Sequence, residues 1–437
     1  MIYYADDYQD RIDQAIRLAT SLGASAAKIS LSHTEANGVG FENARLKQTS
    51  NSETLSYAIM VIVDGHRGAA SGNQPEYLEE LVRRAVTLAK VGAQSHFTTF
   101  PKPADRYRDI QTFDPAVLDY SQDRMIADCQ NLIDYLRALD PALVVGAGAS
   151  KGVSESISMN SAGLVDKDRA TAWHISADFE KTTGTDLLAC GAGRSWGQLN
   201  DLYDLDYIKR KLATDLQRAS REASIPDGKW PLILPPSFVL QFLAPVFMGI
   251  SGRSVFRGTS PLRDKLGTQP FSEALSIEDN PFIDFCSDSA NMDGAGLPTQ
   301  RRMLVENGRL NLFLYDYDTA FMAGKEPTAN DDCAPYNPLV RPGTVHSKEL
   351  FRSVRRGLYI KRLLGFGQSN FANGDFSANV ELGFAVEDGE ITGRLKNVMI
   401  AGNVFEMLAQ PLVVSSNISP SLLQPYLLLP EVTVVSK

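Results

Sequence analysis

The stretch Ile225-Pro226-Asp227-Gly228 marks the point at which the pattern of the sequence changes. Before it, apolar residues recur at helical spacing in several segments that alternate with strand-like runs. After it, helical patterns become scarce and hairpin signals multiply. Asn307-Gly308 and Asp388-Gly389 each lie between apolar flanks, and both dipeptides suit the positive φ angles of a type I′ turn. We therefore predict an α+β fold, with an N-terminal mixed α/β domain over 1–225 and a mainly antiparallel β domain over 226–437.

The first half contains enough local signals to place its elements. Apolar periodicity predicts four helices, and Gly23, Gly92 and Pro141 suit the ends of the first three. A polar, proline-bearing stretch over 93–115 predicts a connecting loop. The helices are expected within 8–22, 75–91, 125–139 and 208–216, and the strands at 26–32, 38–41, 55–63, 67–70, 144–158 and 172–179.

Composition narrows the class of protein. The chain has 437 residues, 43% of them hydrophobic and 22% charged, which is ordinary for a globular protein and excludes a disordered chain. Its formal net charge of −9 disfavours non-specific nucleic-acid binding. The four cysteines are widely spaced, as in proteins of a reducing compartment.

The uncharged stretch up to Gly252 is interrupted by prolines and predicts a buried helix. We expect a cytoplasmic protein without nucleic-acid or membrane partners.

Familiar catalytic and metal-binding motifs are missing from the sequence. The five histidines are far apart, so no HExxH or HxH pair offers two imidazoles to zinc, and no GxSxG elbow is present. Carboxylates do gather in the second half, at Asp284, Asp288 and Asp293 and again at Asp331-Asp332. Such groups can serve acid–base chemistry or bind calcium, but solvated loop carboxylates are the favoured explanation. We predict no metal ligand and no catalytic residue from these patterns.

Several segments together resemble one family. They are Val63-Asp64-Gly65-His66-Arg67-Gly68-Ala69-Ala70-Ser71, Asn160-Ser161-Ala162-Gly163, the run from Asp293 to Arg302, Asn373-Gly374-Asp375-Phe376-Ser377, and Ile400-Ala401-Gly402-Asn403. In this order the segments resemble the TldD/PmbA family, also called TldD/TldE, to which the older label "modulator of DNA gyrase" is attached. The net negative charge of the chain gives no support to direct DNA binding.

The resemblance implies which type of subunit this is. In the family, the TldD-type subunit has an HExxxH helix and a C-terminal cysteine that bind zinc, whereas the PmbA/TldE type lacks them and pairs with it. The corresponding helix here should include 238–247, where Gln241 is the only side chain able to ligate a metal, and the last cysteine is Cys333. The chain thus resembles a PmbA/TldE subunit, without zinc or another cofactor of its own.

We therefore expect a non-catalytic subunit that helps a zinc-bearing TldD-like partner to process small or unfolded peptides. Two alternatives stay open: an autonomous hydrolase with an unrecognised carboxylate site, and an interaction scaffold that pairs with itself as a homodimer. The apolar crowding of the 238–248 segment predicts an interface between chains. The residues predicted to line a substrate cleft are Asn373, Asp375, Phe376, Ser377, Thr299 and Arg301, and those predicted at the interface are Phe238, Phe242 and Phe247.

Overall fold

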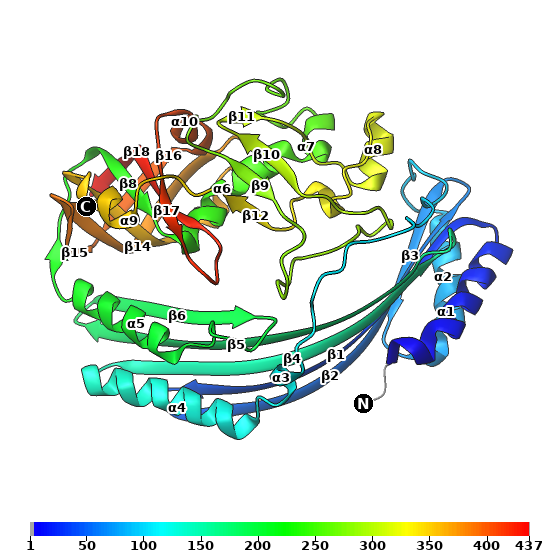
Figure 1. Cartoon of the computed structure of the whole chain (residues 1–437), viewed down its shortest axis with the longest axis horizontal. Helices are drawn as coiled ribbons and strands as arrows, with labels where there is room; N and C mark the ends of the chain where they lie inside the picture. Colours follow the sequence, from blue (N-terminus) through cyan, green and yellow to red (C-terminus); the bar gives the residue numbers. More distant parts are fainter. Residues whose placement is uncertain (1–3, 437) are drawn as a thin grey trace.

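A six-stranded antiparallel sheet of long, curved strands dominates the N-terminal half of the chain (Figure 1). The structure is a computed structural model, and it describes residues 4–436. The strand order is β3-β2-β1-β4-β5-β6. The strands are β1 (Ala24–Glu42), β2 (Arg45–Val63), β3 (His66–Gly72), β4 (Val144–Asn160), β5 (Val165–Thr183) and β6 (Asp186–Trp196).

Strands β1 and β2 are longer than the sequence pattern predicts. The two short strands expected at 26–32 and 38–41 form one strand of 19 residues, and β2 begins at Arg45 rather than at Leu55. The added segments are polar and pair with each other, for example Glu35 with Glu53. Alternating apolar residues reveal a strand only where one face is buried, and the residues of β2 from Arg45 to Thr54 are exposed.

Helices cover both ends of this sheet (Figure 1). At the β1–β3 end lie α1 and α2, and at the β4–β6 end lie α4 and α5. Side chains cap the second pair: Ser121 accepts a hydrogen bond from the backbone N–H of Arg124, and Asp204 accepts one from that of Tyr207. The predicted helices are thus confirmed. The helical segments are α1 (Tyr4–Ser21), η1 (Pro75–Tyr77), α2 (Leu78–Ala89), α3 (Pro115–Leu118), α4 (Gln122–Leu139) and α5 (Leu205–Ala219).

The C-terminal half contains two further sheets, as the hairpin signals predict. One has the order β13-β8-β18-β16-β14-β15-β7 with β17 paired to β18, and the other has the order β11-β10-β9-β12. Most pairs are antiparallel, but β13 with β8 and β15 with β7 are parallel. The strands are β7 (Glu222–Ala223), β8 (Gly228–Leu234), β9 (Ile277–Asp279), β10 (Arg302–Glu306), β11 (Arg309–Leu310), β12 (Pro338–Val340), β13 (Arg356–Leu364), β14 (Asp375–Glu387), β15 (Glu390–Leu395), β16 (Val398–Asn403), β17 (Val413–Ile418) and β18 (Pro425–Ser436).

Both predicted type I′ turns have the required backbone. Asn307 and Gly308 have φ angles of 48° and 78°, and Asp388 and Gly389 have φ angles of 47° and 84°. The first pair joins β10 to β11, and the second joins β14 to β15. The helical segments of this half are α6 (Pro236–Ile250), α7 (Gly252–Phe256), α8 (Tyr317–Ala323), η2 (Asp331–Cys333), α9 (Ser347–Arg352), η3 (Phe366–Gln368) and α10 (Val404–Ala409).

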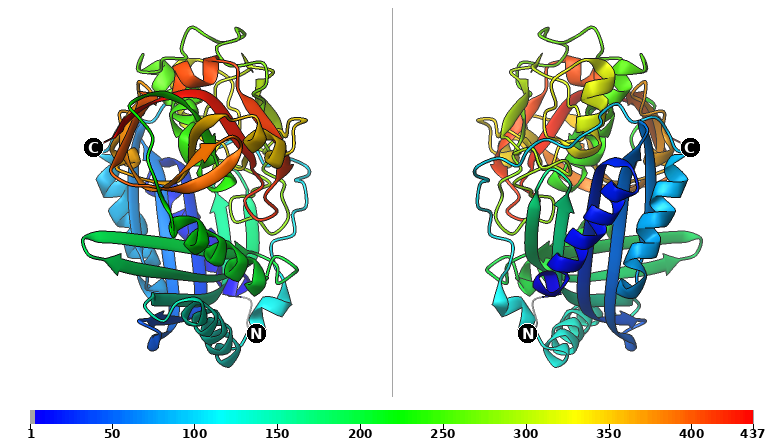
Figure 2. Two further views of the ribbon diagram at one scale, coloured as in Figure 1. Left: turned by 90° about the vertical axis from the view of Figure 1, so that its left-hand side faces the viewer. Right: turned by 90° about the vertical axis from the view of Figure 1, so that its right-hand side faces the viewer.

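The two halves pack against each other and share apolar contacts (Figure 2). One buried cluster contains Trp173 of β5 together with Tyr359 of β13 and Phe384 of β14. A second cluster, around α6, belongs to the C-terminal half, apart from Ala223 and Ile225 just before the predicted boundary. Strand β7, which precedes residue 226, pairs with β15. The division into domains at that residue therefore stays a prediction.

The loop predicted over 93–115 forms most of a strap over 90–114 between the halves. The Tyr107 hydroxyl donates to the Gly296 carbonyl at 2.7 Å, and the Phe285 N–H donates to the Gln111 carbonyl at 2.6 Å. The strap runs beside the C-terminal half before it returns to the sheet at α3 (Figure 1). None of the helices within 4–436 has the length and apolar character needed to cross a bilayer.

Candidate functional site

A cavity of about 800 Å³ lies between the N-terminal sheet and the C-terminal half. Strands β1 to β3 supply one wall, and the loops around α7, α8 and η2 supply the other. The floor is apolar, with Met60, Phe97 and Phe100 among its residues, whereas the rim is charged. The charged lining residues are Lys28, Arg67, Arg253, Asp316, Asp318, Asp331 and Asp332.

Lys28 reaches across the cavity from β1 and joins the two halves. Its Nζ donates to the Gly294 carbonyl, and the Gly294 N–H donates to both carboxylate oxygens of Asp331, at 2.8 and 3.0 Å. A Cβ at Gly294 would lie 3.0 Å from Asp331 Oδ1, so glycine permits this close approach. Burial lowers the pKa of Lys28, while the charges of Asp331 and Asp293 oppose that shift.

Asp293 shapes the turn that carries Gly294. Its Oδ1 accepts hydrogen bonds from the backbone N–H groups of Ala295, at 2.9 Å, and Leu297, at 2.8 Å. Burial raises the pKa of Asp293 to about 6, and the neighbouring charge of Asp331 acts in the same direction. Asp284 of the same predicted cluster accepts a hydrogen bond from the Gln111 N–H at 2.9 Å. These two carboxylates thus hold loop backbone in place.

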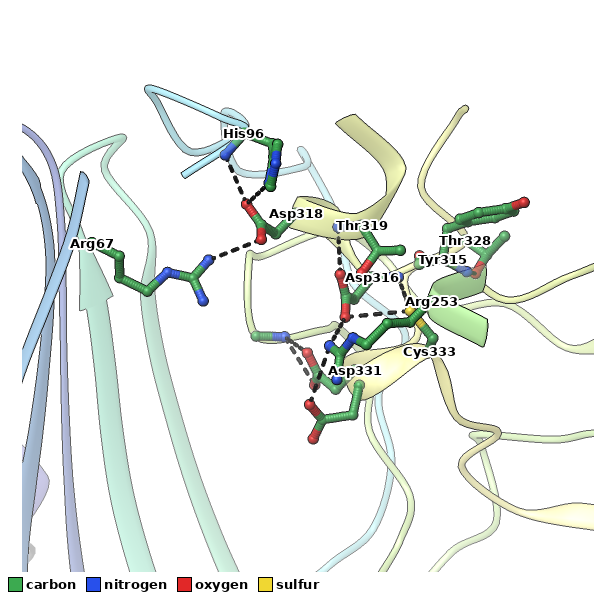
Figure 3. Close-up of polar contacts among 12 residues, drawn as sticks. Arg67, His96, Arg253, Tyr315, Asp316, Asp318, Thr319, Thr328, Asp331 and Cys333 are labelled. Atoms are coloured by element: carbon green, nitrogen blue, oxygen red, sulfur yellow. Dashed lines mark hydrogen bonds and ion pairs between the residues drawn. The ribbon is translucent and has the colours of Figure 1, made fainter. Parts of the chain in front are cut away.

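An ion pair and a thiol hydrogen bond, both to Asp316, complete the far side of the cavity (Figure 3). Arg253 of α7 donates to Asp316 Oδ2 at 2.9 Å, and the Cys333 thiol donates to the same oxygen at 3.3 Å. Asp316 Oδ1 also caps α8 by accepting from the Thr319 N–H at 2.7 Å. Burial opposes ionisation of Asp316, but the bonds from Thr319 and Cys333 and the charge of Arg253 prevail, so its pKa falls below the usual value.

Asp318 connects this side to the strap and to the sheet. It accepts a hydrogen bond from the backbone N–H of His96 at 3.0 Å and pairs with Arg67 of β3 at 3.5 Å (Figure 3). The cavity thus combines an apolar floor with cations and carboxylates in fixed places. Such a surface suits a flexible peptide, whose side chains can meet the floor while its charged groups meet the rim.

Helix α6 is the segment in which the family resemblance places the zinc helix of a TldD-type subunit. Its exposed residues are Ser237, Leu240, Gln241 and Met248. Leu240 faces a second cavity of about 640 Å³, which Trp173 and Phe285 also line. A neutral amide and a thioether are poor ligands for zinc, so the donor set of α6 does not fit that ion.

The predicted interface residues lie on the same helix, mostly on its inner side. Phe238 and Phe242 are only 3% and 1% exposed and pack in the core of this chain, against Phe366. They have no surface to offer a partner, because β13, β14 and β18 already cover that side of the helix. Phe247 is half-buried at the edge of the core, and its contact with a partner stays a prediction.

One group of side chains within 4–436 has the spacing of a cation site, and it lies away from α6. It consists of His33 and Glu35 on β1 and Glu53 on β2. His33 Nε2 lies 2.9 Å from Glu53 Oε1, so these two groups already satisfy each other. Both glutamates are exposed, and exposed carboxylates commonly gather without a metal.

The predicted cleft residues between Asn373 and Ser377 form an ordered turn that enters β14. The Asn403 side chain donates to the Asn373 carbonyl and to Asp375 Oδ1, both at 2.8 Å. Phe376 is buried in the α6 core, whereas Ser377 is exposed on the strand. The turn is not part of the wall of the 800 Å³ cavity. Its role in substrate binding stays a prediction.

Thr299 and Arg301 lie elsewhere again. Buried Thr299 donates its hydroxyl hydrogen to the Ala290 carbonyl at 2.6 Å. Arg301 pairs with buried Glu278, which also binds Arg341 at 2.6 Å. The structure therefore does not gather the predicted cleft residues into one site, and their role in a cleft stays a prediction. It gathers Lys28, Arg67, Arg253 and Asp316 instead, which sequence reasoning missed, although Arg67 and the Asp293 turn belong to segments that carry the resemblance.

Comparison with known protein families decides the identity of the fold. Residues 227–436 match the family model described as PmbA/TldA metallopeptidase C-terminal domain, and residues 27–89 match the model described as PmbA/TldA metallopeptidase domain 1. The chain belongs to the PmbA/TldD family. The two matches contain the whole of α6 and most of β1 to β3, so PmbA/TldD sequences supply both walls of the cavity.

Individual relatives agree over most of the chain. An uncharacterized protein of Methanocaldococcus jannaschii is 29% identical over 364 residues, which are 82% of this chain and 84% of the relative. The Haemophilus influenzae protein named metalloprotease PmbA homolog is 25% identical over 94% of this chain and 92% of its own length. The crystal structure of TldE from Thermococcus kodakarensis is 22% identical, covers 97% of this chain and 100% of its own, and superposes with a TM-score of 0.86.

Proposed function

We propose that this chain is a non-catalytic subunit of the PmbA/TldE type, which assists a zinc-bearing TldD-type partner in processing small or unfolded peptides. The observation that carries the proposal is the surface of α6, where Ser237, Leu240, Gln241 and Met248 stand in place of zinc ligands. Membership of a metallopeptidase family supports the link to proteolysis. A subunit without a metal site contributes through binding and positioning of the substrate.

The 800 Å³ cavity supplies the binding function in this proposal. Its volume is within the range of about 300–1,000 Å³ that is typical of ligand pockets. The apolar floor would accept peptide side chains. Asp331 and Asp332 would attract cationic groups, and Arg67 and Arg253 would attract anionic ones. A peptide held there would be kept extended for the partner.

Co-expression with an HExxxH homologue tests the proposal. We expect the two chains to co-purify, and we expect zinc-dependent cleavage of a denatured casein digest only when both are present. The control is the partner with its HExxxH glutamate replaced by glutamine, which should assemble normally but not cleave. Cleavage by this chain alone, or full activity of the partner without it, would contradict the proposal.

A further inference from the structure

A separate cavity of about 400 Å³ lies at the opposite end of the sheet, between α5, the start of α6, β13 and the segment from Asn417 to Tyr426. It has no lining residue in common with the 800 Å³ cavity. A neighbouring cavity of about 410 Å³ shares Arg218, Tyr359 and Tyr426 with it. The two form one groove along the junction of the halves, which we call the α5 groove.

The α5 groove is basic although the whole chain has a net charge of −9. Arg210, Lys211 and Arg218 line the first of its two cavities from α5, and Lys361 lines it from β13, against the carboxylate of Asp215. The second cavity adds Lys348 and Arg352 against Glu390. The Lys361–Asp215 ion pair is deeply buried, with side-chain exposures of 9% and 3%. Asp215 lies on the α5 face between Lys211 and Arg218, but its ion pair is with Lys361.

Two of these cations lack a counter-charge. No carboxylate within 4–436 forms an ion pair with Lys211 or Arg218, whereas Arg210 pairs with Asp204 at 3.3 Å. The nearest polar partner of Lys211 is the Tyr207 hydroxyl, at 3.5 Å. Arg218 follows Lys211 by seven positions, so both lie on the same face of α5 and line the same groove. Burial lowers the pKa of Lys361, and the charge of Lys211 contributes to that shift, as expected for ammonium groups lying close together.

The remaining walls of the α5 groove are the N-terminal end of α6, which carries partial positive charge, and an apolar surface. Pro235, Pro236 and Ser237 line the groove where α6 begins, and no side chain caps this helix. Its first N–H groups add partial positive charge to that of the side chains. Beside them, Ile418 and Leu422 are 46% and 41% exposed and offer apolar surface to a ligand.

We infer that the α5 groove binds the C-terminal end of a peptide, with the terminal carboxylate between Lys211 and Arg218 and an apolar last side chain against Ile418 and Leu422. The inference rests on the proposed function and adds a feature of the substrate, its free C-terminus. Simple anions such as phosphate share the charge of a carboxylate but have no apolar group to cover Leu422. The apolar wall therefore favours the peptide.

A binding measurement on the purified full-length chain tests the inference without a partner. The probe is a fluorescein-labelled octapeptide ending in Val-Leu, made with a free carboxylate and, separately, with a C-terminal amide. We expect the acid to bind at least about tenfold more tightly than the amide, because only the acid offers the two cations an anionic acceptor. In the Lys211→Gln/Arg218→Gln variant the two forms should bind equally.

Matched controls separate this site from general electrostatics and from the proposed function. The Arg83→Gln/Arg84→Gln variant removes the same charge from exposed positions of α2 and should keep the preference for the acid. Thermal unfolding must show that both variants fold. Equal binding of acid and amide by the wild-type chain, an unchanged preference in the α5 variant, or tighter binding of inorganic phosphate than of the peptide acid would overturn the inference. None of these results depends on the partner, so the co-expression experiment judges the proposed function independently.

Discussion

The two cavities that face the N-terminal sheet differ in the side chains that border them. The 800 Å³ cavity is bordered by ion pairs and charged hydrogen bonds that join the two halves. The 640 Å³ cavity is bordered by Leu240 of α6 and by the rings of Trp173 and Phe285, together with charged residues such as Lys151 and Asp168. Ion pairs that join the halves thus lie around the first cavity, whereas the exposed residues of α6 are two polar and two apolar side chains without charge.

The largest effect is expected from removing Asp316, the carboxylate that binds Arg253 and Cys333 beside the 800 Å³ cavity. Asp316→Ala deletes the acceptor for Arg253 and Cys333 and the cap of α8. We expect the free energy of unfolding to fall by about 3 kcal/mol, measured by urea denaturation. Asp264→Ala, at an exposed turn, is the control and should change it by less than about 0.5 kcal/mol. Equal effects of the two variants would show that the charged contacts around the 800 Å³ cavity stabilise the chain no more than an exposed carboxylate does.

A smaller effect concerns pH. Because the folded state raises the pKa of Asp293 from 3.8 to about 6, the native chain binds more protons than the unfolded chain between these values. The free energy of unfolding therefore falls as the pH rises from about 4 to about 6, by roughly 2 kcal/mol from this group. Asp293→Asn keeps an acceptor for the N–H groups of Ala295 and Leu297 but does not titrate. The variant should lose this part of the pH dependence; an unchanged profile in urea denaturation at pH 4 and 6 would show that Asp293 ionises freely.

A still smaller effect is expected from breaking the Arg67–Asp318 ion pair at the rim of the 800 Å³ cavity. Arg67 and Asp318 lie 3.5 Å apart with side chains that are 40% and 29% exposed. Such a pair contributes about 0.5 kcal/mol and is screened by salt. Arg67→Gln should accordingly cost little stability in urea denaturation, and nothing measurable in 1 M salt. A loss as large as that of Asp316→Ala would mean that the rim holds the halves together, and that its charges are not free for a ligand.

The smallest expected effect is on metal content. After dialysis, elemental analysis of the purified chain should find far less than one zinc ion per chain. Gln241 is the only side chain on the exposed face of α6 with a carbonyl oxygen that could bind a metal, and a neutral amide is a poor zinc ligand. Gln241→Ala should leave that content unchanged. An HExxxH homologue treated in the same way is the positive control. Retention of one zinc ion per chain would show that the chain has a metal site, contrary to this prediction.

Local patterns in the sequence predicted the elements well wherever one side of an element is buried. The helix containing Met125 and the hairpin at Asp388-Gly389 are examples, since an apolar stripe and a turn dipeptide are both short-range signals. The polar continuation of β2 from Arg45 to Thr54 was missed because its strand character comes from pairing with β1, which leaves no apolar alternation in the sequence.

The candidate site was harder to predict because its members come from distant parts of the chain. Asp293 and Asp331 stood out as loop carboxylates, but nothing in the sequence near them indicates that Lys28 lies opposite. The predicted cleft residues Phe376 and Thr299 proved to be buried, because a residue in a family segment can serve packing as well as binding. Only the arrangement of sheet, strap and loops shows which charged residues face one another.

The strap also has a consequence for biosynthesis. The His96 N–H binds Asp318, a residue 222 positions later, and the Tyr107 hydroxyl binds Gly296, 189 positions later. At roughly 5–20 residues per second, a ribosome needs on the order of 10–40 seconds to bridge the longer interval. Until then Phe97 and Phe100 can pack only against the N-terminal sheet, at Ala26 and Ile62, without Ala295 and Tyr317 from the second half. The nascent chain therefore leaves one side of these two rings open to chaperones and proteases for most of the time during which its second half is made.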